Sequence, residues 1–151
     1  MSCVRVLMAI VLAGLLAACS SVPYAQRQRQ QQRQAAYLAA AGAPVRSFRF
    51  VAPLWSWEPL SDTQLAVYTR PNKAWLLDVG GACQNLEFTN AIGLTSNLDE
   101  VSVNFDKVLT GHRDFPCTIT RIRPVDVARL KIEQAKQRKI ESEPRTAAPV
   151  R

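Results

Sequence analysis

Residues 63–80 read TQLAVYTRPNKAWLLDVG, and this stretch predicts the centre of the fold. Apolar side chains recur at every second position in residues 63–69 and again in residues 75–79, which is the period of half-buried strands. Between the two runs, Pro71 presets its φ for a turn and Asn72 tolerates a left-handed backbone. The stretch therefore predicts an antiparallel hairpin that ends at a Gly-Gly pair.

Three shorter runs extend this pattern on either side of the hairpin. Residues 48–50 are Phe-Arg-Phe, and residues 101–105 place two valines and a phenylalanine on one face. Residues 117–122 form a last short strand, which we expect Pro124 to stop because proline lacks a backbone N–H. These runs predict a mainly β domain over residues 45–127, an antiparallel sheet rolled into a small barrel or sandwich.

The chain beyond this domain has a different composition. Residues 126–140 are mostly of types that favour a helix, and the Asp126 side chain is expected to cap it. Val127 and Leu130 are expected to pack on the sheet, whereas the later turns are polar. We therefore assign residues 128–151 to a basic helix and a disordered tail.

The net charge of +7 belongs to the two ends of the chain. Residues 20–49 hold five arginines and no acid, whereas residues 50–123 hold six bases and eight acids. Because few bulky apolar side chains occur between residues 24 and 43, residues 19–44 are interpreted as a flexible linker, or a transient helix. Its arginines are interpreted as a solvated spacer, with adsorption to anionic lipid as the alternative. Nucleic-acid binding is not expected, because no aromatic residues alternate with the charges.

The amino terminus has the pattern of an export signal. The apolar run of residues 6–16 is shorter than the roughly 20 residues that a membrane-spanning helix needs. Residues 16–19, Leu-Ala-Ala-Cys, resemble the lipobox of bacterial lipoproteins, in which small residues precede a cysteine that receives lipid. The resemblance implies a signal peptide over residues 1–18 and lipid, palmitate included, on Cys19, with an ordinary secretory signal as the alternative. Ser20 favours the periplasmic face of the outer membrane by the sorting rule of enteric bacteria.

The cysteine count fits an oxidising compartment. Of four cysteines, Cys3 leaves with the signal and Cys19 is lipidated, so Cys83 and Cys117 remain. A disulfide between these two is favoured in an exported domain with a small core. The alternatives are a metal site or a redox pair, but the sequence has one histidine and neither cysteine belongs to a C-x-x-C motif. We expect no metal and no other cofactor.

The order of short motifs along the middle of the chain is informative in itself. The motifs are Trp57, LAVYT at 65–69, WLLD at 75–78, Cys83 with LEF at 86–88, IGLT at 92–95, FDKV at 105–108, CTI at 117–119 and IRPVD at 122–126. Together they resemble a family of uncharacterised proteobacterial lipoproteins that is defined only as a domain of unknown function. The resemblance implies a lipobox, two domain cysteines and an envelope location, and it implies no activity.

The titratable residues that could act in catalysis are few. His112 is the single histidine and lies in Gly-His-Arg-Asp, which is typical of a solvated loop. Asp99 and Glu100 are adjacent, so in a strand their side chains would face opposite ways. No residue is therefore assigned a catalytic role.

Two aspartates and two tryptophans are candidates for ligand binding. Asp78 and Asp106 each interrupt or end an apolar strand, and a structural ion pair with Arg121 or Arg123 is the first interpretation. Trp55 and Trp57 would share one strand face and could form a binding platform, although in a small sheet tryptophan is usually core.

The residues and the resemblance leave two functions open. The first is a non-catalytic accessory or binding domain, tethered to the envelope through Cys19, whose partner is another envelope protein or a cell-wall polymer. The alternative is a small periplasmic hydrolase or ligand-binding enzyme that uses Asp78, Asp106 or His112.

Overall fold

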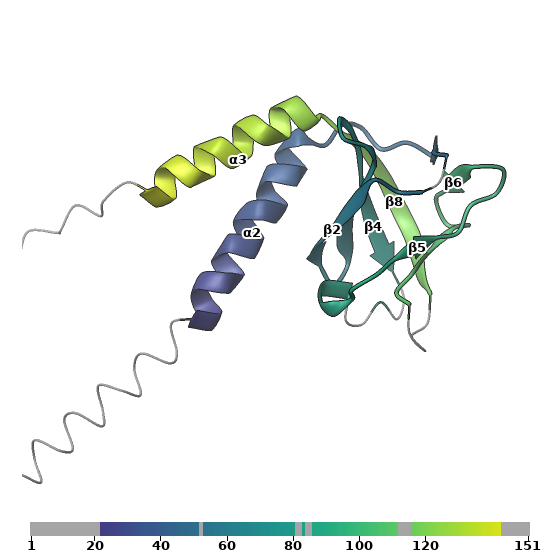
Figure 1. The fold of residues 1–151 in the computed structure, drawn as a ribbon, viewed down its shortest axis with the longest axis horizontal. Coiled ribbons are helices and arrows are strands. Elements are labelled where there is room, and N and C mark those ends of the chain that lie inside the picture. Colours follow the sequence, from purple (N-terminus) through teal and green to yellow (C-terminus); the bar gives the residue numbers. More distant parts are fainter. Residues whose placement is uncertain (1–21, 52, 81–82, 84–85, 112–115, 143–151) are drawn as a thin grey trace, which may run out of the picture. The chain divides into compact units, whose positions relative to one another are not determined.

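The chain divides into two compact units, residues 1–32 and residues 33–151. The computed structural model describes residues 22–51, 53–80, 83, 86–111 and 116–142 (Figure 1). The boundary between the units falls inside helix α2 (Val22–Ala40). The signal peptide and Cys19 expected from the sequence lie outside the described residues, as do His112 and residues 143–151 of the expected tail.

In the first unit, the described residues are the opening turns of α2. Pro23 lies in the first turn, where a missing backbone N–H breaks no helical hydrogen bond. The glutamines and arginines that follow favour a helix, and Gln28 Nε2 donates a hydrogen bond to the Tyr24 hydroxyl at 3.2 Å. The described part of this segment, interpreted from its composition as a flexible linker or a transient helix, is therefore helical.

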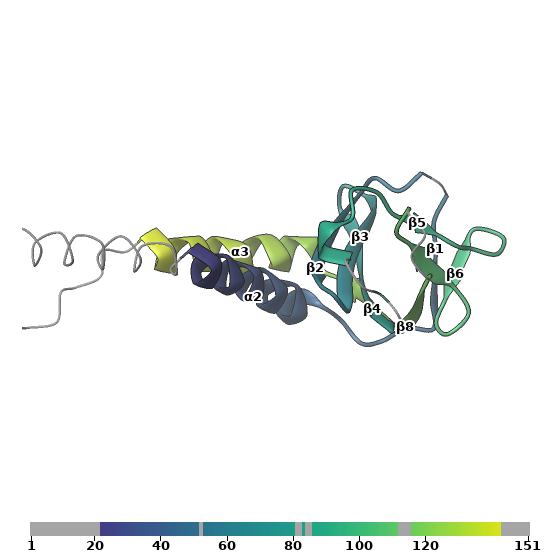
Figure 2. The ribbon, with the colours of Figure 1, turned by 90° about the horizontal axis from the view of Figure 1, so that it is seen from below.

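The second unit is mainly β, which confirms the expected fold class. Six strands form an antiparallel sheet in the order β2-β3-β4-β8-β7-β5, β1 pairs with β6, and the strands curve into a half-barrel (Figure 1, Figure 2). After α2 the elements are β1 (Ser47–Arg49), β2 (Ser56–Ser61), β3 (Gln64–Arg70), β4 (Lys73–Gly80), a 3-10 helix η1 (Leu86–Phe88), β5 (Gly93–Leu94), β6 (Glu100–Ser102), β7 (Lys107–Leu109), β8 (Cys117–Val125) and α3 (Val127–Ser142).

The hairpin expected from residues 63–80 is present as β3 and β4. Leu65 lies opposite Leu77, and Val67 lies opposite Trp75, so their alternate side chains share the inner face of the sheet, which packs on β1 and β6. The buried side chains of this inner core are Phe48, Leu65, Val67, Leu77, Val79, Cys83, Leu86, Val101, Val108, Cys117, Ile119 and Ile122.

The expected disulfide joins Cys83 to Cys117. Cys83 follows the end of β4, and Cys117 is the first residue of β8, so the bond ties the hairpin to the last strand. Both cysteines are buried in the inner core, which places the bond out of contact with solvent.

The outer face of the sheet is covered by the end of α2 and the start of α3. The buried side chains of this outer core are Ala36, Tyr37, Ala40, Leu60, Ala66, Ala74, Leu76, Val125, Val127 and Leu130. Alanines on both the helix and the sheet let the two backbones approach closely. Residues 33–40, which the sequence analysis assigned to a flexible linker or a transient helix, are therefore helical and packed on the sheet, and the second compact unit begins at residue 33.

Two strand predictions also need correction. The strand expected over residues 101–105 ends at Ser102, because Asn104 adopts a left-handed φ of 64° and turns the chain. Phe105, expected on the apolar face, is consequently 69% exposed. Conversely, β8 continues through Pro124, whose carbonyl accepts a hydrogen bond from the Gly42 N–H at 2.8 Å.

Helix α3 begins as the sequence predicts. The Asp126 carboxylate accepts a hydrogen bond from the Arg129 N–H at 3.0 Å, which is an N-cap, and Val127 and Leu130 are buried in the outer core. Across the described parts of the chain, no helix is both long and apolar enough to cross a membrane.

Candidate functional site

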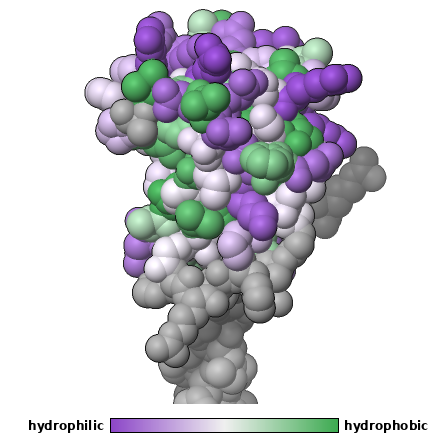
Figure 3. All heavy atoms as spheres, turned by 90° about the vertical axis from the view of Figure 1, so that its right-hand side faces the viewer, coloured by the Kyte–Doolittle hydropathy of each residue, from purple (hydrophilic) through white to green (hydrophobic). Residues whose placement is uncertain are grey.

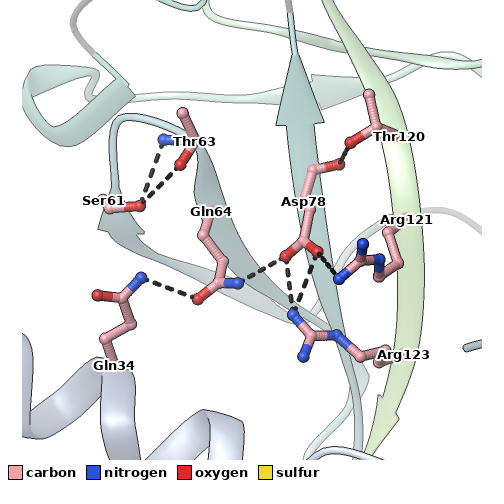
Figure 4. A network of polar contacts seen from close by, with 8 residues as sticks. All are labelled: Gln34, Ser61, Thr63, Gln64, Asp78, Thr120, Arg121 and Arg123. Carbon is pink, nitrogen blue, oxygen red and sulfur yellow. Dashed lines mark hydrogen bonds and ion pairs between the residues drawn. The ribbon is translucent and has the colours of Figure 1, made fainter. Parts of the chain in front are cut away.

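Asp78 is held by a polar network on the outer face of the sheet (Figure 4). Its carboxylate accepts hydrogen bonds from Arg123 Nη2 at 2.9 and 3.2 Å and from Gln64 Nε2 at 2.5 Å. Arg121, directly opposite Asp78 in the register, approaches at 3.5 Å. The expected ion pair is therefore present, and the carboxylate is engaged by three neighbours.

The two arginines beside Asp78 provide a matched comparison. The Arg123 side chain is 15% exposed and the Arg121 side chain is 58% exposed. In double-mutant cycles with Asp78→Ala, we expect Arg123→Met to show a coupling of about 2 kcal/mol and Arg121→Met below about 0.5 kcal/mol, because solvent screens the exposed pair. Urea unfolding of the full chain measures both. Equal couplings would show that burial does not decide the strength of this network.

Polar side chains also join α2 to the outer face of the sheet. Gln34 Nε2 donates a hydrogen bond to Gln64 Oε1 at 3.1 Å, which extends the Asp78 network to the helix (Figure 4). Nearby, the buried Tyr37 hydroxyl donates to Glu58 at 2.6 Å and lies 2.7 Å from the Tyr68 hydroxyl. These hydrogen bonds therefore fix the position of the end of α2 on the sheet. The small alanine side chains between helix and sheet would not by themselves prevent the helix from shifting along the sheet.

Stability should depend on Tyr37 at alkaline pH. Burial, followed by the hydrogen bond to Glu58, raises the pKa of Tyr37 above its usual value of 10.0. Above pH 10 the unfolded chain loses this proton while the folded chain keeps it, so stability falls as pH rises, by up to about 1.4 kcal/mol per pH unit.

We therefore expect Tyr37→Phe to lower stability by about 1 to 2 kcal/mol at pH 8 and to flatten its decline above pH 10. Urea midpoints from pH 8 to 11.5 measure both effects, and Tyr24→Phe, at a position 63% exposed, is the control. A wild-type decline no steeper than that of Tyr37→Phe would contradict the assignment.

Asp106 is buried, being 2% exposed, but it forms no ion pair with any of the described arginines. One carboxylate oxygen accepts a hydrogen bond from Thr95 Oγ1 and the other from the Ser102 N–H, both at 2.7 Å. The expected ion pair with Arg121 or Arg123 is therefore wrong for Asp106. Its carboxylate instead closes the turn that follows β6.

The tryptophans have separate environments. Trp55 is 66% exposed just before β2, whereas Trp57 is partly buried against the inner core. Trp75 stacks on Phe48 with ring centroids 4.8 Å apart. Trp57 therefore fits the core role that is usual for tryptophan in a small sheet, and a binding platform formed by Trp55 and Trp57 remains a prediction.

A surface cleft of about 530 Å³ opens where β1, the β3–β4 turn and the turn before β6 come together. It is lined by Arg49, Phe50, Val51, Thr69, Arg70, Lys73, Leu98 and Asp99. A chain of aromatic contacts connects the β1 side of the cleft to the β3–β4 turn. The ring centroids of Phe50 and Phe48 are 6.1 Å apart, and Phe48 stacks on Trp75. Lys73 Nζ lies 5.7 Å from the Trp75 ring centroid.

The cleft is positively charged, with three bases against one acid. Within the described residues, none of Arg49, Arg70 and Lys73 forms an ion pair. Arg70 and Lys73 flank the turn predicted from the sequence, but the cluster itself was not predicted. It depends on the packing of Arg49 from β1 beside that turn, which no local pattern in the sequence indicates.

The face that carries β6 shows apolar side chains scattered among hydrophilic ones (Figure 3). Among the described residues, no group of three or more His, Cys, Asp or Glu side chains could hold a metal ion. The sheet and the cleft together define this part of the chain as a small antiparallel β-domain with a basic surface cleft.

The chain belongs to a family of unknown function, DUF6491, whose model matches residues 2–141. That match includes α2 and most of α3 as well as the sheet. No curated protein and no solved structure matches the chain.

Proposed function

We propose that this protein is a bacterial envelope lipoprotein whose β-domain binds another envelope component without catalysing a reaction. The observation that carries the proposal is the engagement of both candidate carboxylates, Asp78 and Asp106, in hydrogen bonds that hold the fold. The described cleft, in contrast, offers cations and apolar side chains, which suit binding.

The sequence of residues 16–19 supports anchoring of the chain through Cys19, and Ser20 supports the outer membrane. Two or three acyl chains on one cysteine give durable anchoring, since each buried methylene contributes about 0.8 kcal/mol. The domain would then act at the periplasmic face of that membrane.

Metabolic labelling with alkyne palmitate tests the anchor. We expect label on the wild-type chain, recovered in the outer-membrane fraction, and none on Cys19→Ser, which should keep its signal peptide and migrate more slowly. An unlabelled wild-type chain, or label that survives Cys19→Ser, would contradict lipidation at this residue.

In-cell crosslinking followed by mass spectrometry tests the binding role, again with Cys19→Ser as control. One abundant envelope partner, lost when the anchor is removed, is the expected result. Recovery of the lipidated chain without a partner would count against an accessory role and favour the hydrolase alternative, for which His112 would be the first residue to replace because Asp78 and Asp106 are engaged in hydrogen bonds.

A further inference from the structure

We propose that the basic cleft binds the phosphate group of an anionic phospholipid. The proposal deepens the function proposed above and rests on it only for the nearness of a membrane. Three properties of the cleft favour a lipid over a protein or a soluble anion: its charge, its apolar rim and the conformation of that rim.

The positive charge is concentrated in the cleft and is not a general property of the β-domain. Residues 50–123 contain more acids than bases, yet Arg70 and Lys73 from this region meet Arg49 around one cavity. Asp99 is the single acid among the lining residues. A guanidinium presents paired donors that match the oxygens of a phosphate, and an ammonium adds a point charge. An anion is therefore the complementary ligand.

The rim of the cleft is apolar and exposed. Val51 is 82% exposed and Leu98 is 86% exposed. Both line the same cavity as the three cations. A soluble phosphate would gain nothing from these side chains, whereas at a lipid surface they would enter the boundary between headgroups and acyl chains.

The backbone conformation of the rim also indicates a binding site. Leu98 and Asp99 have φ values of 50° and 60° and form the two-residue turn between Asn97 and Glu100. Such turns favour Asn-Gly, because other residues are strained at positive φ. A leucine held there at the surface of the cleft packs little in the described structure, and such strain is often found where a ligand binds.

The test uses the full chain in micelles of a neutral detergent and follows backbone amides by NMR. Dihexanoyl phosphatidylglycerol is the probe, while dihexanoyl phosphatidylcholine and inorganic phosphate are the comparison ligands. We expect amides of the lining residues to shift saturably with phosphatidylglycerol, and far less with the other two at equal concentration. Equal shifts with inorganic phosphate would mean that the cleft takes a free anion, and equal shifts with phosphatidylcholine would mean that charge is irrelevant; either result overturns the proposal.

Two charge variants decide whether the cleft itself is responsible. Arg49→Gln with Arg70→Gln should weaken binding of phosphatidylglycerol about 30-fold, at roughly a factor of five per charge. Arg129→Gln with Arg138→Gln removes the same charge from exposed positions on α3 and should change binding less than about twofold. An equal loss in both variants would show diffuse attraction and overturn the proposal.

The amide spectrum of each variant reports whether that variant is folded. If a variant does not fold, the wild-type titrations with the three ligands still test the proposal. Failure of this proposal is distinguishable from failure of the proposed function. The titrations do not require lipid on Cys19, whereas palmitate labelling does not involve the cleft.

Discussion

Replacement of Cys83 and Cys117 by alanine is expected to lower the free energy of unfolding by about 3 to 4 kcal/mol. The bond closes a loop with a sequence separation of 34, and its loss returns the corresponding chain entropy to the unfolded state. Because both cysteines are buried in the inner core, the two alanines also leave unfilled volume, which adds to the loss.

Urea unfolding of the full chain, with and without dithiothreitol, measures this effect. The wild-type chain in dithiothreitol should lose nearly as much stability as the double variant, and the double variant should not respond to the reductant. A loss below about 1 kcal/mol would show that the core, rather than the bond, holds β8 to the hairpin.

Asp106→Ala is expected to have the next largest effect, a loss of about 3 kcal/mol. The substitution removes the acceptor for the Ser102 N–H and the Thr95 hydroxyl, and it leaves these donors in a partly buried site. Hydrogen bonds to a charged acceptor are among the stronger ones, and here they close the turn between β6 and β7.

Asp106→Asn and Asp99→Asn are the matched controls. Asparagine keeps one acceptor oxygen, so Asp106→Asn should fall between the alanine variant and the wild type. The Asp99 side chain is exposed and forms no hydrogen bond or ion pair with another described residue, and asparagine tolerates its positive φ of 60°, so Asp99→Asn should change stability by less than about 0.5 kcal/mol. If Asp106→Ala unfolds at the wild-type urea midpoint, the structural role argued for this carboxylate is wrong.

The parts of the fold that could be predicted depend on neighbouring residues in the chain. The hairpin of β3 and β4 follows from a period of two and a Pro-Asn turn, and the start of α3 follows from Asp126 as its cap. The disulfide between Cys83 and Cys117 was predicted from the number of cysteines and from the oxidising compartment that the amino terminus suggests.

The parts that could not be predicted depend on residues distant in the chain. Nothing local distinguishes the last turns of α2 from a solvated helix, because the surface that buries Tyr37 is made by β2 and β3. The apolar alternation of residues 101–105 predicts a strand, but the chain turns after Ser102. The Asp106 carboxylate accepts a hydrogen bond from the Ser102 N–H and so closes this turn. The cleft likewise exists only because β1 reaches the β3–β4 turn, a neighbour relation that composition does not encode.

The position of β8 determines the order in which the domain can assemble. This last strand lies between β4 and β7, and its carbonyls at Ile122 and Pro124 also accept hydrogen bonds from Val45 and Gly42 near the start of the domain. Until residue 125 is available, the earlier strands lack their central neighbour and the first segment lacks its partner. If the chain is exported from its amino terminus, as the proposed function requires, it would therefore complete this sheet only after nearly all of it had crossed the translocation pore.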